Sequence, residues 1–354
     1  MTLLQTTIRQ IGSQDPGWRQ KAKERLDQLA IPHWALGRLM DLAMDLAGQT
    51  RSMQPPVSRK AVITMAGDHG VAAEGVSKFP QEVTPQMVAN FVNGGAGINV
   101  LARHAGAEVI VVDMGVAADL SALVRSGKVI DKKIAFGTAN MAAGPAMSRE
   151  EAIRSLEAGI DVVAMHGDRF DVFATGDMGI ANTTPSSAIA ALLTGHSAID
   201  VTGRGTGLDD QQLAAKVRVI EASLALNQPD PSDGLDVLAK VGGFEIGGIA
   251  GVILGAAARR KPVVIDGFIS TAGALIAQRL APESIQYVIA AHRSVEPGHR
   301  LMQEALGLSP LLDLDLRLGE GTGAALALPI VEAAAKVLIE VATFAEAAVA
   351  GADK

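Results

Sequence analysis

One carboxylate near the end of the chain differs from the other acids because three glycines surround it. Glu320 lies in the run Leu318-Gly319-Glu320-Gly321-Thr322-Gly323, where a solvated surface acid would usually have helix formers beside it. Glycine adopts positive φ readily and lets a ligand approach the backbone, so a carboxylate here could accept a proton or a hydrogen bond from a ligand. The same segment is also consistent with the start of a C-terminal helix that has Glu320 near its positive end.

A second candidate is the glycine-rich run Gly203-Arg204-Gly205-Thr206-Gly207, which precedes a stretch with helical character. Unhindered backbone amides at the positive end of a helix favour an anion, so this run is suited to a phosphate. Lys216, about two turns into that helix, would add a point charge. A tight surface turn and a solvated lysine are the alternative, because G-x-G-x-G lacks the spacing of the dinucleotide fingerprint.

A third loop brings unlike polar groups together. It contains the carboxylate of Asp177, Gly179, the amide of Asn182 and the hydroxyls of Thr183 and Thr184. Such groups suit a ribose and a phosphate beside a helix N-terminus. A plain strand-to-helix connection capped by Thr184 would explain Thr184 but not the other polar residues.

Short apolar runs that end in glycine with aspartate or histidine would position these loops. Each run precedes a stretch with helical periodicity, which is the pattern of parallel strands joined by crossover helices. We therefore predict an α/β fold with an open, mostly parallel, Rossmann-like sheet and flanking helices. Ligands of such sheets bind beyond the carboxyl ends of the strands. The predicted strands cover 61–66, 109–112, 170–175, 262–265 and 285–290.

Helix-start signals adjoin several of these runs. Ser148 and Glu151 form a capping box, and Asp209 is expected to begin the helix after the glycine-rich run. Thr184 and Pro185 are expected as the N-cap and first residue of another helix. Both chain ends also read as helical, with one helix expected to open at Pro32 and a long helix expected over 329–350.

Composition excludes several classes of protein. Of the 354 residues, 48% are hydrophobic and 19% charged, which favours a buried core over disorder. A net charge of -7 makes a nucleic-acid partner unexpected. Cysteine is absent, which excludes disulfides and thiolate chemistry, and neither a paired-histidine motif nor a P-loop motif occurs. We expect no metal, no cofactor and no membrane-spanning segment, and we expect a cytoplasmic protein.

Several of these motifs together resemble one enzyme family. The loops around Asp177, Gly203 and Glu320, together with the segments 292–299 and 306–314, resemble nicotinate-nucleotide:dimethylbenzimidazole phosphoribosyltransferases. The resemblance extends from about Ala61 to Ala325, with the motifs in the family's order. It implies a large catalytic domain at 61–325 and a smaller helical domain built from 1–60 and 326–354. It also implies a homodimer.

The resemblance further implies a reaction. The family transfers the 5-phosphoribosyl group of nicotinate mononucleotide to 5,6-dimethylbenzimidazole, with inversion, giving α-ribazole 5'-phosphate and nicotinate for the lower ligand of cobalamin. Nicotinate leaves as a neutral pyridine and needs no general acid, whereas the attacking benzimidazole becomes cationic and must lose a proton. Glu320 is the residue expected to accept that proton.

Other residues receive roles through the same resemblance. Phe79 and Met87 would sandwich the flat base, although core packing is the commoner role of such side chains. The base-pocket residues are Ser77, Phe79, Gln86, Met87, Met178 and Leu318. The phosphate, ribose and nicotinate residues are Asp177, Gly179, Asn182, Thr183, Gly203, Arg204, Gly205, Lys216 and Ser294.

The sequence departs from the family pattern at two positions. Asp177 stands where the family usually has glutamate, and Ala181 where it usually has glycine. The shorter Asp177 is expected to reach its partner through water. Two alternatives stay open at this point: a phosphoribosyltransferase with another azole or purine acceptor, and a non-catalytic nucleotide-binding homologue.

Overall fold

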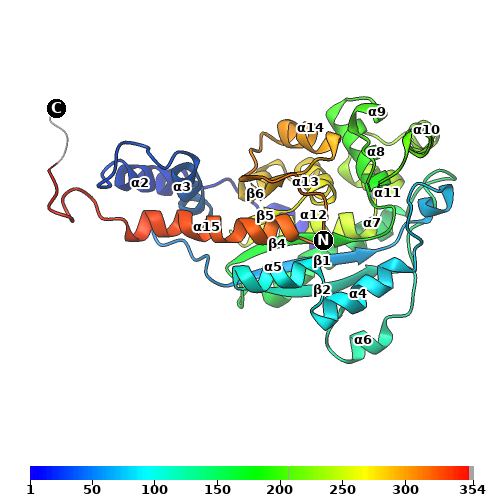
Figure 1. The fold of residues 1–354 in the computed structure, drawn as a ribbon, viewed down its shortest axis with the longest axis horizontal. Coiled ribbons are helices and arrows are strands. Elements are labelled where there is room, and N and C mark those ends of the chain that lie inside the picture. The colour runs from blue at the N-terminus through cyan, green and yellow to red at the C-terminus, as the bar shows by residue number, and fades with distance from the viewer. Residues whose placement is uncertain (206, 351–354) are drawn as a thin grey trace.

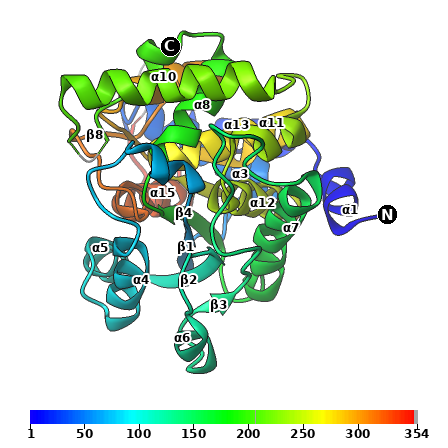
Figure 2. The ribbon, with the colours of Figure 1, turned by 90° about the vertical axis from the view of Figure 1, so that its right-hand side faces the viewer.

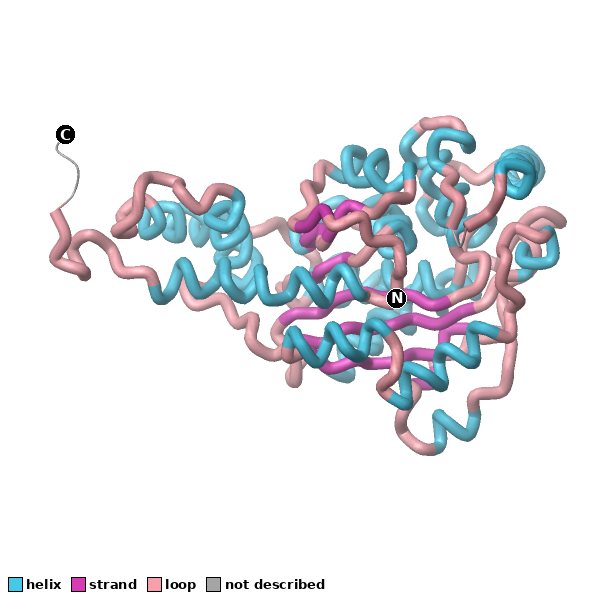
Figure 3. The backbone as a smooth tube through the Cα atoms, viewed as in Figure 1, coloured by secondary structure: helices cyan, strands magenta, loops and turns pink. Residues whose placement is uncertain are grey.

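Six strands form one central sheet in the computed structural model, which describes residues 1–205 and 207–350 (Figure 3). Their order is β3-β2-β1-β4-β5-β6, and every adjacent pair is parallel. The predicted open parallel sheet is thereby confirmed. The strands are β1 (Lys60–Gly67), β2 (Ala107–Gly115), β3 (Ile130–Asp131), β4 (Val172–Met178), β5 (Val263–Ile265) and β6 (Val288–Ala290), and a separate pair comprises β7 (His292–Arg293) and β8 (Leu312–Asp313).

The strand order reverses between β1 and β4, which lie side by side although the 104 residues 68–171 lie between them in the sequence. In open α/β sheets the crossover connections leave this position in opposite directions, so a crevice forms beyond the carboxyl ends of the two strands. The loops that follow β1 and β4 therefore lie where a ligand is expected.

Helices cover both faces of the sheet. Figure 2 shows α4 and α5 on one side of β1 and β2, with α7 and α12 on the other. The helices are α1 (Leu3–Gln10), α2 (Pro16–Leu26), α3 (Arg38–Thr50), α4 (Val83–Asn93), α5 (Gly97–Ala105), α6 (Ser121–Arg125), α7 (Arg149–His166), α8 (Thr183–Thr194), α9 (Ala198–Val201), α10 (Asp210–Asn227), α11 (Gly234–Val241), α12 (Phe244–Ala258), α13 (Phe268–Leu280), α14 (Pro297–Leu306) and α15 (Thr322–Glu340), with 3₁₀ turns at Gly70–Glu74 and Pro282–Tyr287.

Each face of the sheet contributes to its own core. In β1, Ile63 and Met65 join the core beneath α7 and α12, whereas Val62 and Ala66 join the core beneath α5 and α15. This alternation follows the two-residue period of a strand. Because both faces are covered, the whole of β1 is buried, as the continuous apolar run in the sequence predicts.

The helix α12 is buried nearly throughout and packs closely on α7. A Cβ atom added at Gly159 would lie 2.0 Å from the carbonyl oxygen of Gly248, and one at Gly251 would lie 2.1 Å from that of Leu156. Glycine is therefore required at both positions because the two backbones touch. The small residues of α12 therefore reflect close helix packing.

Helices from the two chain ends lie side by side, where α2 and α3 accompany the C-terminal half of α15 away from the sheet (Figure 1). The N–H of Ala30 donates to the carbonyl of Ala342 (2.9 Å), and the N–H of Phe344 donates to that of Gln28 (3.0 Å). Arg25 Nε also donates to the carbonyl of Leu338 at 2.8 Å. The division into domains at 60 and 325 stays a prediction, and residues 351–354 of the last segment lie outside the described residues.

Two of the predicted helix starts are confirmed. Ser148 caps α7 through a capping box with Glu151, and Asp209 caps α10 through a capping box with Gln212. The predicted start of α8 is wrong, because it lies two residues too late. The helix begins at Thr183 with Asn182 as N-cap, so Thr184 and Pro185 both lie inside its first turn.

Proline misled the sequence interpretation at both chain ends. The helix expected at Pro32 begins only at Arg38, because Trp34 and Gly37 adopt φ values of 55° and 51° that interrupt a helix. The C-terminal helix begins at Thr322 rather than at Pro329 and ends at Glu340. The N–H groups of Gly321 and Ala324 donate to Asp266, which fixes the start of the helix and leaves the proline within it.

The strand expected over 285–290 is also shorter than predicted. Residues Pro282–Tyr287 form a 3₁₀ helix, and only Val288–Ala290 pair with β5. The side chain of Tyr287 is fully buried, and its hydroxyl donates to the carbonyl of Gly12 at 2.9 Å. The apolar residues before Val288 therefore reflect helix packing rather than strand pairing.

The helix α15 is, by length and composition alone, able to cross a membrane, which the sequence interpretation did not recognise. It has 19 residues, and 56% of its most apolar window is buried inside the protein. Ala324, Ala327, Leu328 and Val331 all belong to the core beneath the sheet. Packing in this core explains the apolar composition of the helix.

Replacing Leu338 by alanine tests how firmly α15 joins the terminal helices. Leu338 is fully buried in the core that includes Ala22 and Leu26 of α2, so the substitution is expected to lower the free energy of unfolding by about 2–5 kcal/mol. Ile339, which is 37% exposed, is the matched control and is expected to lose about 1 kcal/mol or less. Equal losses in urea denaturation would contradict this packing.

Candidate functional site

The turn that carries Glu320 is fixed against three neighbouring strands. Glu320 has a φ of 64°; its N–H donates to the carbonyl of Asp177 on β4 (3.2 Å), and its carbonyl accepts from Thr64 Oγ1 on β1 (3.0 Å). After β5, Asp266 accepts from the N–H groups of Gly321 (3.2 Å) and Ala324 (2.9 Å). These hydrogen bonds hold the glutamate rigidly beside the switch point, the place between β1 and β4 where the strand order reverses.

The glycines around Glu320 are required by contact as well as by conformation. Gly321 has a φ of 98°, and a Cβ there would lie 2.5 Å from Val62 Cγ1. A Cβ at Gly323 would lie 2.1 Å from His292 Cδ2. The expectation that these glycines leave room for a ligand is incomplete, because Gly321 and Gly323 instead allow the turn to pack against the sheet.

The Glu320 carboxylate lies at the N-terminus of α5. The N–H of Ile98 donates to Glu320 Oε2 at 3.0 Å, and the glutamate is 6% exposed. Burial raises the pKa of Glu320 and the nearby Asp266 carboxylate adds to the rise, while the Ile98 hydrogen bond opposes it. A carboxylate with a raised pKa is a better proton acceptor than a solvated glutamate.

One carboxylate oxygen of Asp177 is hydrogen-bonded, and the other has no hydrogen-bond partner among the described residues. Oδ2 accepts from Asn182 Nδ2 at 3.0 Å, whereas Oδ1 is buried without a partner in the described part of the chain. Burial raises the pKa of Asp177 well above its ordinary value, and the carboxylates of Asp266, Glu245 and Glu320 raise it further. The free oxygen is a site where a bound hydroxyl or water would form a hydrogen bond.

A buried ion pair lies next to Asp177, beneath the switch point. His69 Nε2 and Glu245 Oε1 are 2.8 Å apart, and both side chains are inaccessible to solvent. Burial opposes a charged imidazole, but Glu245 raises the pKa of His69 overall. Glu245 was not predicted as a site residue. Its signal was a single acid in an otherwise apolar helix, which is expected only with a partner.

The glycine-rich loop after α9 covers a buried lysine, Lys216, which lies on the helix that follows the loop. Lys216 Nζ donates to Thr183 Oγ1 at 2.6 Å and is 1% exposed. A Cβ added at Gly205 would lie 3.7 Å from Lys216 Nζ. Burial lowers the pKa of Lys216 to about 8, and Glu296 opposes the shift. The alternative of a solvated lysine is therefore wrong.

A cavity of about 540 Å³ opens beside this loop. Gly203, Gly205, Glu296 and Arg317 contribute to its lining. Glu296 Oε2 is buried without a partner among residues 1–205 and 207–350, so an unpaired acceptor lies at the cavity. Thr206, the fourth residue of the run, lies outside the described residues.

Arg204 does not turn toward Lys216. Its Nη1 donates to the carbonyl of Leu208 at 2.9 Å, and its Nη2 pairs with Asp210 on the exposed side of the loop. Ser294 is buried, and its Oγ accepts from the N–H of Glu296 at 3.3 Å. Arg204 lines the cavity beside this loop, whereas Ser294 is connected to it through the hydrogen bond with Glu296. The contact of either residue with a nucleotide stays a prediction.

The predicted base pocket lies on the first turns of α4 and on the loops around it. Phe79 and Leu318 are 51% and 62% exposed, so both apolar side chains are accessible to a ligand. Met87 and Met178 are half-buried, Gln86 is exposed, and Ser77 Oγ accepts from the N–H of Phe79 at 3.3 Å. The sandwich of a base between Phe79 and Met87 stays a prediction.

The helix α4 is tied directly to the loop that carries Asp177. Thr84 Oγ1 donates to Asp68 Oδ1 at 2.6 Å and accepts from the N–H of Ile180 at 3.1 Å. Asp68 also accepts from the N–H of Ala117 at 2.9 Å. The ends of β1, β2 and β4 are therefore linked to α4, so the predicted base pocket and the sugar site share one rigid support.

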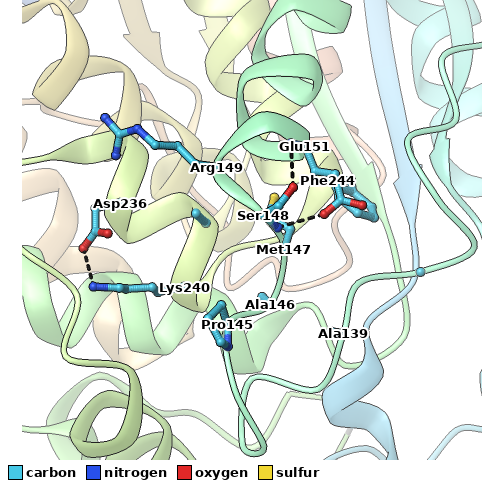
Figure 4. A pocket seen from close by; sticks show the side chains of 12 residues that line it. Ala139, Pro145, Ala146, Met147, Ser148, Arg149, Glu151, Asp236, Lys240 and Phe244 are labelled. Atoms are coloured by element: carbon cyan, nitrogen blue, oxygen red, sulfur yellow. Dashed lines mark hydrogen bonds and ion pairs between the residues drawn. The ribbon is translucent and has the colours of Figure 1, made fainter.

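A separate cavity of about 410 Å³ lies between the N-terminus of α7 and α11 (Figure 4). Its basic side chains already have acidic partners: Lys240 pairs with Asp236 at 2.9 Å, and Arg149 pairs with Asp233 at 2.8 Å. None of the predicted site residues lines this cavity. In the described ranges, no group of three or more His, Asp or Glu side chains is arranged to hold a metal ion.

The fold and these side chains define an α/β protein with a small-ligand site at the carboxyl edge of a Rossmann-like sheet. A family model described as "Phosphoribosyltransferase" matches residues 11–349. Taken together with the curated relatives that it matches, the chain belongs to the nicotinate-nucleotide–dimethylbenzimidazole phosphoribosyltransferase family. The family resemblance of the sequence motifs is thereby confirmed.

Similar proteins cover the chain over nearly its whole length. The nicotinate-nucleotide–dimethylbenzimidazole phosphoribosyltransferase of Syntrophotalea carbinolica is 66% identical over 349 residues, which are 99% of each chain. That of Desulfotalea psychrophila is 58% identical over 355 residues, covering 100% of each chain. A crystal structure of the enzyme from Thermus thermophilus has a TM-score of 0.89 and 45% identity, and the match covers 96% of this chain and 100% of that one.

Proposed function

We propose that this protein transfers the 5-phosphoribosyl group from nicotinate mononucleotide to 5,6-dimethylbenzimidazole. The products are α-ribazole 5'-phosphate and nicotinate, for the lower ligand of cobalamin. The observation that carries the proposal is Glu320, a buried carboxylate with a raised pKa at the switch point, next to the exposed apolar side chain of Leu318. Membership of the family named above supports the same reaction.

The proposed chemistry needs one proton acceptor. Nicotinate departs from a cationic glycosidic nitrogen as a neutral pyridine ring, so the leaving group needs no acid. Dimethylbenzimidazole attacks the anomeric carbon through one nitrogen and becomes cationic, and Glu320 removes the proton from the other nitrogen. A positive charge is thus present on the ligand until Glu320 accepts the proton.

The nucleotide is held from the opposite side of the crevice. Lys216 and the backbone of Gly203 and Gly205 bind the 5'-phosphate, since an ammonium and the N–H groups of a glycine-rich loop both favour an anion. The free oxygen of Asp177 accepts a ribose hydroxyl directly or through water. Asn182 keeps Asp177 in place through its hydrogen bond at 3.0 Å.

A nicotinate-release assay tests the proposal. The purified protein is mixed with nicotinate mononucleotide, with and without dimethylbenzimidazole, and released nicotinate is measured by chromatography. Release that depends on the base supports the transfer, and binding without release would instead support a non-catalytic nucleotide-binding protein. A panel of other azoles and purines identifies any different preferred acceptor, which would replace dimethylbenzimidazole in the proposal.

The stereochemistry of the product provides a second test. A single displacement with attack opposite the leaving group inverts the anomeric carbon from β to α. Proton NMR of the product is therefore expected to show the α anomer, whereas a β product would exclude a single displacement.

We also propose that the protein is a homodimer that buries the outer face of α15. Leu326, Pro329, Ile330, Ala333 and Val337 recur at helical spacing on this face and are exposed or half-buried. A row of apolar side chains on one side of a helix is typical of an interface. The cytoplasmic location expected from the sequence stays a prediction, which cell fractionation would test.

The substitution Ile330→Asp tests the homodimer, because a carboxylate on the proposed interface would be buried without a partner. Light scattering after size-exclusion chromatography is expected to show a dimer for the wild type and a monomer for the variant. Lys336→Gln, at an exposed position of the same helix, is the matched control and should remain dimeric. A dimeric Ile330→Asp variant would place the interface elsewhere.

A further inference from the structure

Asp266 is a fully buried carboxylate that the proposed reaction does not use directly. It follows β5 and is 1% exposed, and its two oxygens accept from two different backbone amides. Those amides belong to Gly321 and Ala324, the residues that follow Glu320 and begin α15. Asp266 therefore caps the N-terminus of α15 from outside the helix, across 55 residues of sequence between Asp266 and Gly321.

This cap holds the backbone of the turn that carries Glu320. Gly321 is the residue next to Glu320, and its φ of 98° sets the direction in which the helix leaves the turn. Ala324 lies one helical turn further on. Since Asp266 holds both amides, a change in its hydrogen bonds would move the turn relative to β1 and β4.

Buried side chains also lie close to Asp266. His292 Nε2 lies 3.6 Å from Asp266 Oδ1 and packs against Gly323, where a Cβ would lie 2.1 Å from the ring. His292 also faces His299, with ring centroids 5.9 Å apart. Thr271 Oγ1 lies 2.9 Å from His299 Nε2, so the groups behind Asp266 form a buried network.

The opposite side of the turn offers no substitute for this cap. Thr64 and the carbonyl of Asp177 hydrogen-bond to the backbone of Glu320 alone and do not hold the residues that follow it. No side chain within α15 caps its first turn, because the N-cap position is Gly321. The start of the helix thus depends on Asp266.

We propose that Asp266 is a positioning residue, which acts on catalysis by holding the Glu320 carboxylate in the geometry that accepts the proton from the acceptor base. The inference rests on the proposed function of Glu320. It assigns Asp266 no contact with either substrate. Loss of Asp266 is therefore expected to lower kcat while leaving the KM for nicotinate mononucleotide nearly unchanged.

The substitution Asp266→Asn retains the size of the side chain but replaces one acceptor oxygen by an NH₂ group that faces an amide donor. We expect kcat for base-dependent nicotinate release to fall by about 10- to 100-fold, as for a general base misplaced by a fraction of an ångström or more. The matched control is Asp113→Asn. Asp113 is also a buried strand-end aspartate, and it accepts from the N–H of Val116 at 3.0 Å, but it lies on β2 away from the turn.

A double-mutant cycle distinguishes positioning from a general structural role. In the Glu320→Gln background, where no base is left to position, Asp266→Asn is expected to change the residual rate by less than about twofold. A similar fall in both backgrounds would overturn the proposal, and so would wild-type kcat in Asp266→Asn. Wild-type turnover in Glu320→Gln alone would instead overturn the proposed function of Glu320.

Folding is monitored by circular dichroism and by titration with nicotinate mononucleotide. If Asp266→Asn does not fold, the same cycle is carried out with Asp266→Ser, whose shorter side chain leaves room for a water molecule in place of the carboxylate. Failure of both variants to bind nicotinate mononucleotide would indicate a role in folding alone and would overturn the proposal. Retained binding with a Glu320-dependent loss of kcat would support it.

Discussion

Replacing Glu320 by glutamine is expected to lower turnover by about 10² to 10⁴, or roughly 3–5 kcal/mol of transition-state stabilisation, with the fold intact. The amide has nearly the same shape as the carboxylate but accepts no proton at neutral pH. Because the lost interaction forms as the base acquires charge, kcat should fall while the KM for nicotinate mononucleotide stays close to that of the wild type. Steady-state nicotinate release with dimethylbenzimidazole measures both constants.

The pH profile provides an independent readout of the same residue. Burial raises the pKa of Glu320, so the active ionised form is lost as pH falls through a value above the ordinary range for glutamate. Activity of the wild type should therefore decline on the acid side, and the Glu320→Gln variant should lack that decline. Wild-type turnover in a folded Glu320→Gln variant would remove the assignment.

The control for this experiment lies on the same helix. Glu332 is a carboxylate of α15 that pairs with Lys336 at 2.8 Å and also with Lys60, twelve residues after Glu320 in the sequence. Glu332→Gln makes the same chemical change and is expected to leave kcat unaltered. A comparable loss in Glu332→Gln would indicate that any charge change in α15 disturbs the enzyme.

Replacing Lys216 by alanine is expected to raise the KM for nicotinate mononucleotide by about 10- to 150-fold, corresponding to a charged hydrogen bond of about 1.5–3 kcal/mol. The KM for dimethylbenzimidazole should change much less, because the ammonium lies beneath the glycine-rich loop and contacts Thr183. Equal increases in both constants would contradict the assignment of Lys216 to the phosphate.

The pH dependence of nucleotide binding should also identify Lys216. Its pKa of about 8 means that the empty site holds an ammonium below that pH and a neutral amine above it. Affinity for nicotinate mononucleotide is therefore expected to fall as pH rises above about 8, since the phosphate, with a second pKa of about 6, remains a dianion. Isothermal titration calorimetry of the wild type and Lys216→Ala should show this fall only in the wild type.

Lys240→Ala provides the matched control for the lysine experiments. Lys240 pairs with Asp236 at 2.9 Å and lines the separate cavity of Figure 4, which contains no predicted site residue. Its removal takes away one positive charge from the protein without altering the glycine-rich loop. A loss of nucleotide affinity in Lys240→Ala similar to that in Lys216→Ala would attribute the effect to net charge.

Local signals in the sequence predicted much of the framework. The strands around Ile63, Val111 and Phe173 can be predicted because both faces of a parallel sheet are buried, which makes their residues mostly apolar. The capping boxes at Ser148 and Asp209 were recognised because a cap and its partner lie within one turn. Such signals act over a few residues and can be read without the rest of the chain.

Contacts between distant segments decided the details of the site. The helix α15 starts before Pro329 because Asp266 accepts its first amides, and a proline rule cannot include a partner on another strand. Lys216 is buried rather than solvated because the loop of Gly205 covers it.

The sequence by itself determined that a carboxylate framed by glycines, a glycine-rich anion loop and a lysine-bearing helix belong to an α/β protein. Only the tertiary structure decided that β1 and β4 adjoin, that Glu320 is fixed by Thr64, Asp177 and Asp266, and that Glu245 pairs with His69. The physical reason is the distance along the chain over which each interaction acts. Residue types and spacing specify conformations of neighbouring residues, whereas burial and charge at the site arise from segments that chain crossing brings together.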